Sequence, residues 1–352
     1  MSKNVTVIGN GPLSLSIAAR AVVRGAAVTY IDLQKKMQTG YQVPVEVTGI
    51  EEYVVNFKEV TQSFDPVSDA EIIMVTVTGS AHDMVFENIV PKVKSEQIVA
   101  FFPACFGAIN FLAKLRQNGK EATVCEAVSF PCVCADKSPE SIHIQNIKSS
   151  LRMAVYPTAK TDAVVSMLNQ YFDIFEPAKN FLETSMDNMN MTLHPLPVLL
   201  NVSWAEKDAD SFRHYVDGIS PAVGRLMERV DEERMAIGDA FGLQLTSAYD
   251  QLVQYYGERN LPSLWEYASS LNGPYTQVKG FGLNSRYVEE DIPYLLVAAA
   301  ELGKSCGVTT PTMDLCVQLA SALMKTDYIQ KGYSLKRMGF EGLSKEEILR
   351  LV

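Results

Sequence analysis

The 352-residue sequence lacks any unbroken run of the roughly 18 to 20 apolar residues that a membrane-spanning helix requires. Its first residues, MSKNVTVIGNGP, lead directly into a strand pattern, without the basic and apolar segments of a secretion signal. Positive charge is also scarce, since 31 basic residues face 41 acidic ones and the formal net charge is −10. This balance argues against a nucleic acid or an anionic membrane as the main partner. We therefore expect a cytoplasmic protein that binds neither.

Cysteine occurs six times, but never in the C-x-x-C spacing of common metal and redox sites. Cys132 and Cys134 stand two residues apart in SFPCVCAD, which on a strand places both side chains on one face. Scattered cysteines of this kind are typical of reduced core thiols in a cytoplasmic protein. We expect no metal site, and the sequence contains no internal repeat.

Short apolar segments alternate with helical patterns in the first half of the chain. Strands are predicted over residues 4–9, 26–32, 70–78 and 96–103, and helices over residues 12–25 and 82–93. This alternation is typical of a parallel sheet that is buried on both faces. From residue 121 to about residue 155 the pattern is mostly that of strands, so we expect the sheet to continue there with antiparallel or mixed pairing.

After about residue 183 the strand pattern fades and helical patterns follow. One of them has Ser220 as a helix N-cap, Pro221 at the first helical position and Gly242 just past the end. Further helices are predicted over residues 290–307 and 311–325. Because the chain is too long for one comfortable core, we predict two domains: an α/β Rossmann domain, residues 1–183, and an all-α domain, residues 184–352. The apolar residues at helical spacing in the first of these helices are Val223, Met227, Val230, Ile237 and Phe241.

The segment VIGNGPLS places two glycines directly after the first predicted strand and before the first predicted helix. This is the G-x-G part of a dinucleotide-binding fingerprint, in which the first glycine permits a tight turn and the second lets the backbone approach a pyrophosphate. Ser14 replaces the third glycine with another small residue. The alternative is a purely structural glycine turn. The residues predicted to hold the dinucleotide are Gly9, Asn10, Gly11, Pro12 and Leu13.

Asp32 ends the second predicted strand, at about the expected 20 residues after the glycine loop. A carboxylate at this place accepts hydrogen bonds from the adenosine ribose and repels a 2′-phosphate, which favours NAD as the cofactor. Lys35 and Lys36 follow directly and can compensate the charge of a 2′-phosphate, so NADP is not excluded.

Two more loops, TVTGSAHDM and FFPACFG, follow the ends of predicted strands. Ligands of an open parallel sheet lie outside the carboxyl ends of its strands, so these loops supply candidate lining residues. They are Thr78, His82, Cys105 and Phe106, of which we assign Thr78 to the cofactor and Cys105 to the substrate. For His82, a role as a simple helix cap is an equally good interpretation.

The apolar stretch NMNMTLHPLPVLLN contains one histidine, His194, followed by Pro195. Proline removes a backbone donor and disfavours the α conformation of the residue before it, so the helix should end or restart at His194. Asn190, four residues earlier, lies on the same helical face. Taken alone, this stretch favours a buried histidine whose hydrogen-bonding needs a neighbour satisfies.

A second charged segment, NSRYVEEDIPY, precedes another predicted helix. Asp291 stands at the N-cap position with Pro293 in the first turn, and a capping role explains it without any catalysis. The functional interpretation is that Asp291 orients an imidazole while Arg286 binds a substrate carboxylate. Histidine suits proton transfer near neutral pH, and arginine suits bidentate carboxylate binding.

Together, the G-x-G loop, NMNMTLHPLPVLLN, NSRYVEEDIPY and the tail GYSLKRMGFEGLS resemble the octopine/nopaline (opine) dehydrogenase family. The resemblance extends over nearly the whole chain. Its most specific parts are Asn190-x-x-x-His194-Pro and Arg286-x-x-x-x-Asp291-x-Pro, whereas the G-x-G loop is generic.

The resemblance implies a Rossmann domain and a helical domain related to the tail of 6-phosphogluconate dehydrogenase, with the substrate in the cleft between them. Such enzymes condense an α-keto acid, commonly pyruvate, with the amino group of an amino acid and reduce the imine with NAD(P)H. His194 and Asp291 match the catalytic dyad of the family, and Asn190 and Arg286 match its substrate-binding positions. One loop departs from the family pattern: PACFG, with Cys105, stands where "PG" and a polar side chain are common, which puts the choice of pyruvate in question.

Two other functions stay open at this point. A ketopantoate-reductase-like or 2-hydroxyacid dehydrogenase acts on a keto acid without an amine and commonly uses a catalytic lysine, for which Lys279 is the nearest candidate. A non-catalytic dinucleotide-binding redox sensor has no need of a histidine–aspartate pair. The sequence does not identify the amino-acid substrate or the oligomeric state, for which a homodimer is the working prediction.

Overall fold

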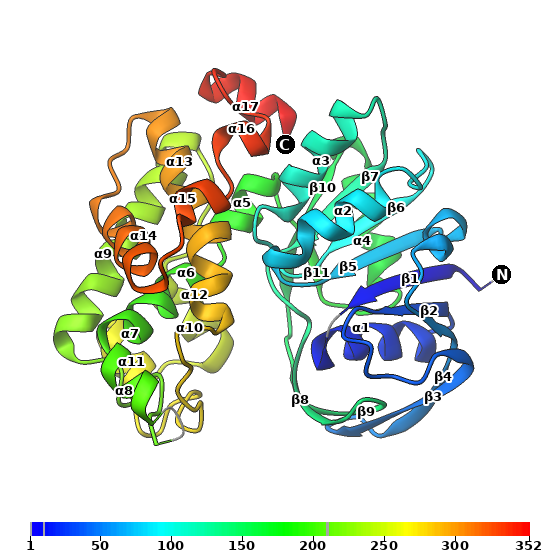
Figure 1. Cartoon of the computed structure of the whole chain (residues 1–352), viewed down its shortest axis with the longest axis horizontal. Helices are drawn as coiled ribbons and strands as arrows, with labels where there is room; N and C mark the ends of the chain where they lie inside the picture. Colours follow the sequence, from blue (N-terminus) through cyan, green and yellow to red (C-terminus); the bar gives the residue numbers. More distant parts are fainter. Residues whose placement is uncertain (1, 10, 209–210) are drawn as a thin grey trace. The chain divides into compact units, whose positions relative to one another are not determined.

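The computed structural model describes residues 2–9, 11–208 and 211–352. The chain forms two compact units, one of residues 1–184 together with Val352 and one of residues 185–351 (Figure 1). The first unit is built on a sheet and the second is helical, so the predicted α/β Rossmann fold followed by an all-α domain is confirmed. No helix formed by the described residues is long and apolar enough to cross a membrane.

Among the described residues, eleven strands form one sheet in the order β11-β10-β7-β6-β5-β1-β2-β4-β3-β9-β8. The central strands β7, β6, β5, β1, β2 and β4 are parallel, and the sheet continues on both sides with mixed pairing, as predicted. The strands are β1 (Asn4–Gly9), β2 (Ala27–Asp32), β3 (Gly40–Gly49), β4 (Tyr53–Thr61), β5 (Ile72–Thr76), β6 (Ile98–Phe101), β7 (Thr123–Ala127), β8 (Cys132–Ser138), β9 (Ser141–Ile147), β10 (Leu151–Tyr156) and β11 (Phe175–Pro177).

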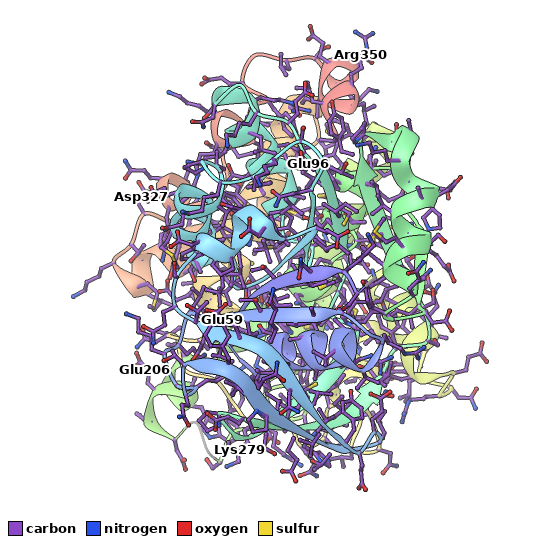
Figure 2. All side chains as sticks on the ribbon, turned by 90° about the vertical axis from the view of Figure 1, so that its right-hand side faces the viewer. Glu59, Glu96, Glu206, Lys279, Asp327 and Arg350 are labelled. Atoms are coloured by element: carbon purple, nitrogen blue, oxygen red, sulfur yellow. The ribbon has the colours of Figure 1, made fainter. Side chains whose placement is uncertain are left out.

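The parallel strands β7, β6, β5, β1 and β2 are buried on both faces because helices cover this part of the sheet on either side. Ile17 of α1 (Pro12–Val23) and Leu168 of α4 (Thr161–Asn169) belong to the same core as Val5 and Val7 of β1. On β6, Phe101 packs against aromatic rings of two further helices, α2 (His82–Ile89) and α3 (Gly107–Gln117). Figure 2 shows the side of this unit that carries β1, α1 and β4, with Glu59 of β4 labelled.

The sequence analysis does not predict β3 and β4, which form an antiparallel pair at the end of the parallel strands. In β3, Val43, Val45 and Val47 are buried while the residues between them face outward. This alternation is the pattern of a strand with only one covered face, which is weaker than the continuous apolar runs of the central strands.

The helical unit is arranged around the long helix α9 (Pro221–Phe241), which packs against α6, α7, α11, α13 and α14. The only strand-like pairing among its described residues is an isolated bridge between Arg213 and Lys279. The helices of this region are α5 (Phe181–Met186), α6 (Asn190–Leu193), α7 (Pro195–Leu200), α8 (Val202–Lys207), α10 (Ala248–Tyr256), α11 (Leu264–Ser269), α12 (Arg286–Glu289), a π-helical segment (Ile292–Leu296), α13 (Val297–Cys306), α14 (Pro311–Met324), α15 (Tyr328–Lys331), α16 (Leu335–Met338) and α17 (Lys345–Leu351).

Helix α9 begins and ends where the sequence predicts. The hydroxyl of Ser220 accepts a hydrogen bond from the backbone N–H of Val223 at 3.3 Å, and Pro221 is the first helical residue. Gly242 follows the last turn with a left-handed backbone (φ +63°), which glycine adopts without strain. The residues expected on its apolar face, Val223, Met227, Val230, Ile237 and Phe241, are all buried.

We predict that Ser220→Ala destabilises the helical unit by about 1 kcal/mol, because one N–H at the start of α9 loses its acceptor. Trp204 and Trp265 are the two tryptophans of the chain and both belong to this unit, so tryptophan fluorescence during urea unfolding reports on it. Ser220→Asp keeps a capping oxygen and serves as the matched control. Equal stability of the alanine and aspartate variants would show that the cap contributes nothing.

Candidate active site

His194 lies at an interruption between two short helices. Helix α6 ends at Leu193 and α7 begins at Pro195, so the predicted break at the proline is confirmed. The backbone N–H of His194 donates to the carbonyl of Asn190 at 3.0 Å. Helices of four and six residues are not stable by themselves, so tertiary contacts must fix the position of this turn.

The imidazole of His194 is hydrogen-bonded to the carboxylate of Asp291, with 2.7 Å between Nδ1 and Oδ2. Both residues are buried, with 4% and 2% of their surfaces exposed. Because the carboxylate is the acceptor, we assign the Nδ1–H tautomer to His194, which leaves Nε2 available for proton exchange. Asp291 does occupy the N-cap position of the π-helical segment, but its side chain caps no backbone N–H and binds His194 instead.

Two other predicted site residues lie on the short helices that precede the two members of this dyad. Asn190 begins α6 and is half-buried, and its side-chain amide makes no hydrogen bond within the described part of the chain. Arg286 begins α12 and is exposed, with its guanidinium 5.5 Å from the ring centre of Tyr287. Within the described residues Arg286 forms no direct ion pair, but the nearby carboxylates of Glu290 and Asp291 stabilise its charge and raise its pKa.

Burial and the charge of Arg286 together set the protonation of the dyad. Burial, followed by the positive charge of Arg286, lowers the pKa of His194 well below its ordinary value. Burial raises the pKa of Asp291 to about 7, although Arg286 opposes the shift. The hydrogen-bonded pair therefore takes up one proton near neutral pH, and that proton belongs to the pair rather than to either residue alone. A group with this property can give and accept a proton at physiological pH.

An aromatic cluster around His194 was not predicted from the sequence. The ring of Tyr287 stacks on His194 with 3.8 Å between centres and 9° between planes. His214 contacts Tyr287 edge-to-face at 4.6 Å and is fully buried, and burial lowers its pKa to about 3, so it stays neutral. Nδ1 of His214 has no hydrogen-bond partner among the described residues. Only the position of Tyr287 beside Arg286 in SRYVEED could have indicated this cluster.

The glycine loop packs β1 tightly against α1. A Cβ on Gly9 would overlap the Cβ of Ser14 and lie 2.7 Å from the hydroxyl of Tyr30. The hydroxyl of Ser14 donates to the carbonyl of Thr76 at 2.8 Å, so this serine fills the place of the third glycine and also ties α1 to β5. By contrast, the nearest atom to a Cβ on Gly11 is 3.9 Å away, on Gln34.

The start of α1 has the features of a pyrophosphate site. Helix α1 begins at Pro12, next to Leu13, and no side chain caps its first N–H groups. Uncapped N–H groups and the helix dipole together favour a phosphate. The predicted contact at Asn10 lies outside the described residues.

Asp32 organises the loop after β2. Its carboxylate accepts hydrogen bonds from the backbone N–H groups of Gln34, Lys36 and Met37 at 3.0, 2.7 and 2.8 Å. Beside it lies a cavity of about 190 Å³, which matches the place of an adenosine ribose in a Rossmann fold. The residues that line the cavity are Gly11, Leu15, Tyr30, Asp32, Gln34, Lys36, Met37, Ser138 and Pro139. These residues fit a dinucleotide.

The site residues predicted at the carboxyl ends of the other strands differ in their burial and in their contacts. Thr78 is half-buried, and its hydroxyl is 3.0 Å from that of Ser80. Cys105 and Phe106 are buried, with 1% and 0% exposure. His82 does not cap α2, because it is the first helical residue and stacks on Phe86 in the core. Within the described residues, no three His, Cys, Asp or Glu side chains form a group that could hold a metal ion.

Comparison with known proteins assigns the glycine loop and the His194–Asp291 pair to one family of enzymes. Residues 177–324 match the family model described as the NAD/NADP octopine/nopaline dehydrogenase, alpha-helical domain. The opine dehydrogenase of Arthrobacter sp. (strain 1C) is 31% identical over 350 residues, which cover 97% of each chain. The chain belongs to the octopine/nopaline (opine) dehydrogenase family. It is an NAD(P)-dependent oxidoreductase acting on CH–NH groups, which joins a keto acid to the amino group of an amino acid by reductive condensation.

Solved structures with a similar fold agree with this assignment. An octopine dehydrogenase structure that holds NADH and L-arginine has a TM-score of 0.80 at 19% identity and covers 99% of this chain and 98% of that one. A yersinopine dehydrogenase with bound NADP+ has a TM-score of 0.76 at 14% identity, with coverages of 99% and 97%. At these identities the likeness shows the fold alone.

We predict that alanine substitutions at the two loop glycines have different effects. Gly9→Ala should lower stability by about 1 to 3 kcal/mol, because its Cβ overlaps Ser14 in a packed core. Gly11→Ala should leave the melting temperature unchanged, because its Cβ has space, but should weaken NADH binding at least about tenfold by crowding the pyrophosphate. Thermal unfolding and NADH fluorescence titration of both variants measure this. Unchanged NADH affinity of Gly11→Ala would contradict the assignment of the loop.

Proposed function

We propose that the enzyme condenses pyruvate, or a similar small α-keto acid, with the amino group of an amino acid, and that His194 and Asp291 are its proton-donating dyad. The observation that carries this proposal is the buried hydrogen bond between His194 and Asp291 beside the positive charge of Arg286. Structures of octopine dehydrogenase with NADH and either L-arginine or pyruvate support the substrate classes.

The overall reaction consumes one proton, because keto acid, amino acid, NAD(P)H and a proton give the secondary amine, NAD(P)+ and water. A reduced nicotinamide, when bound, supplies the hydride. Nε2 of His194 donates the proton to the substrate atom that gains electron density, which is the carbonyl oxygen when it leaves as water. Asp291 holds the Nδ1–H of the same ring and stabilises the charged form, which an isolated buried imidazole would not hold.

Arg286 and Asn190 are proposed to position the substrates. The planar guanidinium of Arg286 matches a carboxylate geometrically, and both substrates carry one. The half-buried amide of Asn190, four residues before His194, offers both a donor and an acceptor close to the dyad. Cys105 is kept as a proposed substrate contact in the loop PACFG.

We infer that NAD is preferred over NADP. Asp32 is buried at the end of β2, and three backbone N–H groups on its oxygens fix its carboxylate next to the cavity for the ribose. A fixed negative charge there repels a 2′-phosphate. Lys36 lines the same cavity and weakens this preference, so NADPH serves as a poorer cofactor. The contacts proposed for the cofactor are those of Gly9, Gly11, Pro12, Leu13, Asp32 and Thr78.

The cellular location and the assembly are also proposals. A cytoplasmic location agrees with six free cysteines, which include the neighbours Cys132 and Cys134. A homodimer is the proposed assembly, and the mass of the purified protein in solution by light scattering tests it.

We predict that the rate of reduction falls as the pH rises through about 7. Below this pH the dyad holds the additional proton that the reaction consumes, and above it the proton is lost, so kcat should drop about tenfold per pH unit. The rate of the reverse oxidation should rise over the same interval.

In Asp291→Asn, the buried imidazole of His194 loses the carboxylate that stabilises its protonated form. The rate of reduction should therefore fall about 10²-fold, and the pH above which this rate declines should be lower than in the wild type. An unchanged pH profile in this variant excludes the dyad as the proton donor.

An omission assay separates the proposed reaction from that of a keto-acid reductase. Oxidation of NADH or NADPH is followed with pyruvate and other keto acids, each with and without a panel of amino acids. We expect turnover only when both substrates are present, and His194→Ala should lower it by at least about 10²-fold while NADH binding is retained. Turnover without any amine would contradict the proposal and favour a 2-hydroxyacid dehydrogenase.

A further inference from the structure

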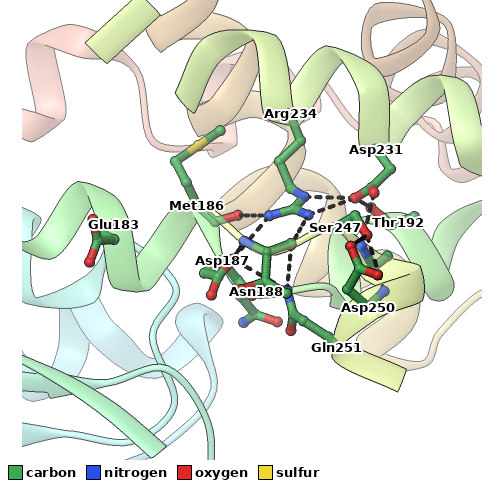
Figure 3. A network of polar contacts seen from close by, with 12 residues as sticks. Glu183, Met186, Asp187, Asn188, Thr192, Asp231, Arg234, Ser247, Asp250 and Gln251 are labelled. Carbon is green, nitrogen blue, oxygen red and sulfur yellow. Dashed lines mark hydrogen bonds and ion pairs between the residues drawn. The ribbon is translucent and has the colours of Figure 1, made fainter. Parts of the chain in front are cut away.

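A buried arginine, Arg234, lies at the centre of a polar network that includes Met186, Asp187 and Asp231 (Figure 3). The side chain of Arg234, on α9, has no exposed surface. We propose that Arg234 is a positioning residue for the proton donor: it fixes residues 186–192, the segment that leads into His194. This inference rests on the role proposed above for the dyad of His194 and Asp291.

The guanidinium of Arg234 holds the beginning of this segment directly. Nη1 donates to the carbonyl of Met186 at 2.9 Å and lies 3.4 Å from Oδ1 of Asp187. Nη2 donates to the carbonyl of Thr246 at 2.6 Å, and the backbone N–H of Thr246 donates to Asp187 at 2.8 Å. Arg234 and Asp187 therefore clamp two separate stretches of chain together. The side-chain amide of Gln251 also donates a hydrogen bond to the backbone carbonyl of Asp187 at 3.0 Å.

The same arginine reaches helix α6 through Asp231. Nε of Arg234 donates to Oδ1 of Asp231 at 2.8 Å, and the hydroxyl of Thr192 lies 3.4 Å from that same oxygen. Thr192 is fully buried and stands two residues before His194. The other oxygen of Asp231 accepts from the backbone N–H of Ala248 at 2.9 Å, so the carboxylate itself cannot turn freely.

Hydrogen bonds within the segment carry this fixed position to the histidine. The side-chain oxygen of Asn188 accepts from the backbone N–H of Asn190 at 3.1 Å, and the carbonyl of Asn190 accepts from the N–H of His194. Helix α6 has only four residues, and Pro195 prevents it from continuing as one helix into α7. The network is thus a polar anchor for the backbone of a turn that has little intrinsic stability.

Stability alone does not account for such a network. Buried ion pairs are often replaced by apolar residues of similar volume without loss of stability, because removing charges from water is costly. An arginine between two carboxylates instead specifies one arrangement of the chain, since each of its donors has a fixed direction. The turn that carries His194 is where a fixed arrangement affects the reaction, because a displacement of about 1 Å can lower a rate about 10²-fold.

The test compares two substitutions. Arg234→Met keeps approximately the length of the side chain, and Arg234→Lys keeps its charge but not the planar guanidinium with its several N–H donors. Glu233→Gln is the matched control. Glu233 is the neighbouring residue on α9 and accepts from the backbone N–H groups of Thr312 and Met313 at 2.8 and 3.0 Å, on the side of α14. For each variant the folded fraction is taken from tryptophan fluorescence, and kcat, KM and the pH profile are measured on folded enzyme.

We expect kcat of Arg234→Met to fall about 10²-fold and its pH limb to move, while the affinity for NADH stays unchanged. Arg234→Lys should lie between this variant and the wild type. Glu233→Gln should lose stability but keep kcat and pH profile. A direct readout that needs no turnover is the NMR resonance of the Nδ1–H of His194, which should broaden or shift in the Arg234 variants only.

Thr192→Val keeps the test decisive if Arg234→Met does not fold, because it removes only the hydroxyl between α6 and Asp231; we expect about a tenfold fall in kcat. Folded Arg234→Lys and Thr192→Val enzymes with wild-type kcat, pH profile and imidazole resonance would overturn the inference. A wild-type enzyme without turnover on any pair of keto acid and amino acid would refute the proposed function instead. In that case the imidazole resonance still decides whether Arg234 positions His194.

Discussion

The hydrogen bond between His194 and Asp291 is the interaction on which the chemistry proposed for the helical unit depends. Both partners are buried, and an ionised carboxylate in such a place is costly unless it is hydrogen-bonded. The bond supplies a partner for the carboxylate, and the nearby charge of Arg286 compensates part of its cost. The same burial that makes the pair costly brings its proton affinity close to neutral pH. Stability and function are therefore opposed at this point, and the surrounding structure has to hold the pair together.

Both partners of the dyad lie where a proline interrupts helical regularity. Pro195 follows His194 directly, and Pro293 stands two residues after Asp291, in a π-helical segment. A π-helical turn leaves backbone groups without their usual partners, and here the carbonyl of Pro293 accepts from the N–H of Tyr333 at 3.1 Å. A Cβ on Gly332 would overlap this carbonyl, so glycine is required for the close approach. This contact gives the tail motif GYSLKRMGFEGLS a physical function, namely the support of the turn that presents Asp291.

The sequence predicted the elements whose causes are local. The cap at Ser220, the left-handed Gly242 and the strand–glycine–helix of the first unit are each set by a few neighbouring residues, and the structure contains them as expected. Strand β4 was missed because its role is set by a partner strand and one covered face, which a single segment does not reveal. Asp291 stands at the start of a helical segment as predicted, but its side chain caps no N–H and instead binds His194, 97 residues away, a partner that no local pattern reveals.

The same distinction explains which parts of the candidate site were identified and which were not. His194 and Asp291 were found through a family resemblance, since nothing in either segment alone indicates that they meet. Tyr287 and Arg234 have no such pattern: an aromatic residue beside an arginine, and an arginine in a charged helix, are ordinary in sequence. Only the fold shows that one ring stacks on the imidazole and that the buried guanidinium anchors the chain before it. If His194 donates the proton as proposed, its place on a turn between two short helices requires both contacts: one fixes the plane of the ring, and the other fixes the backbone that carries it.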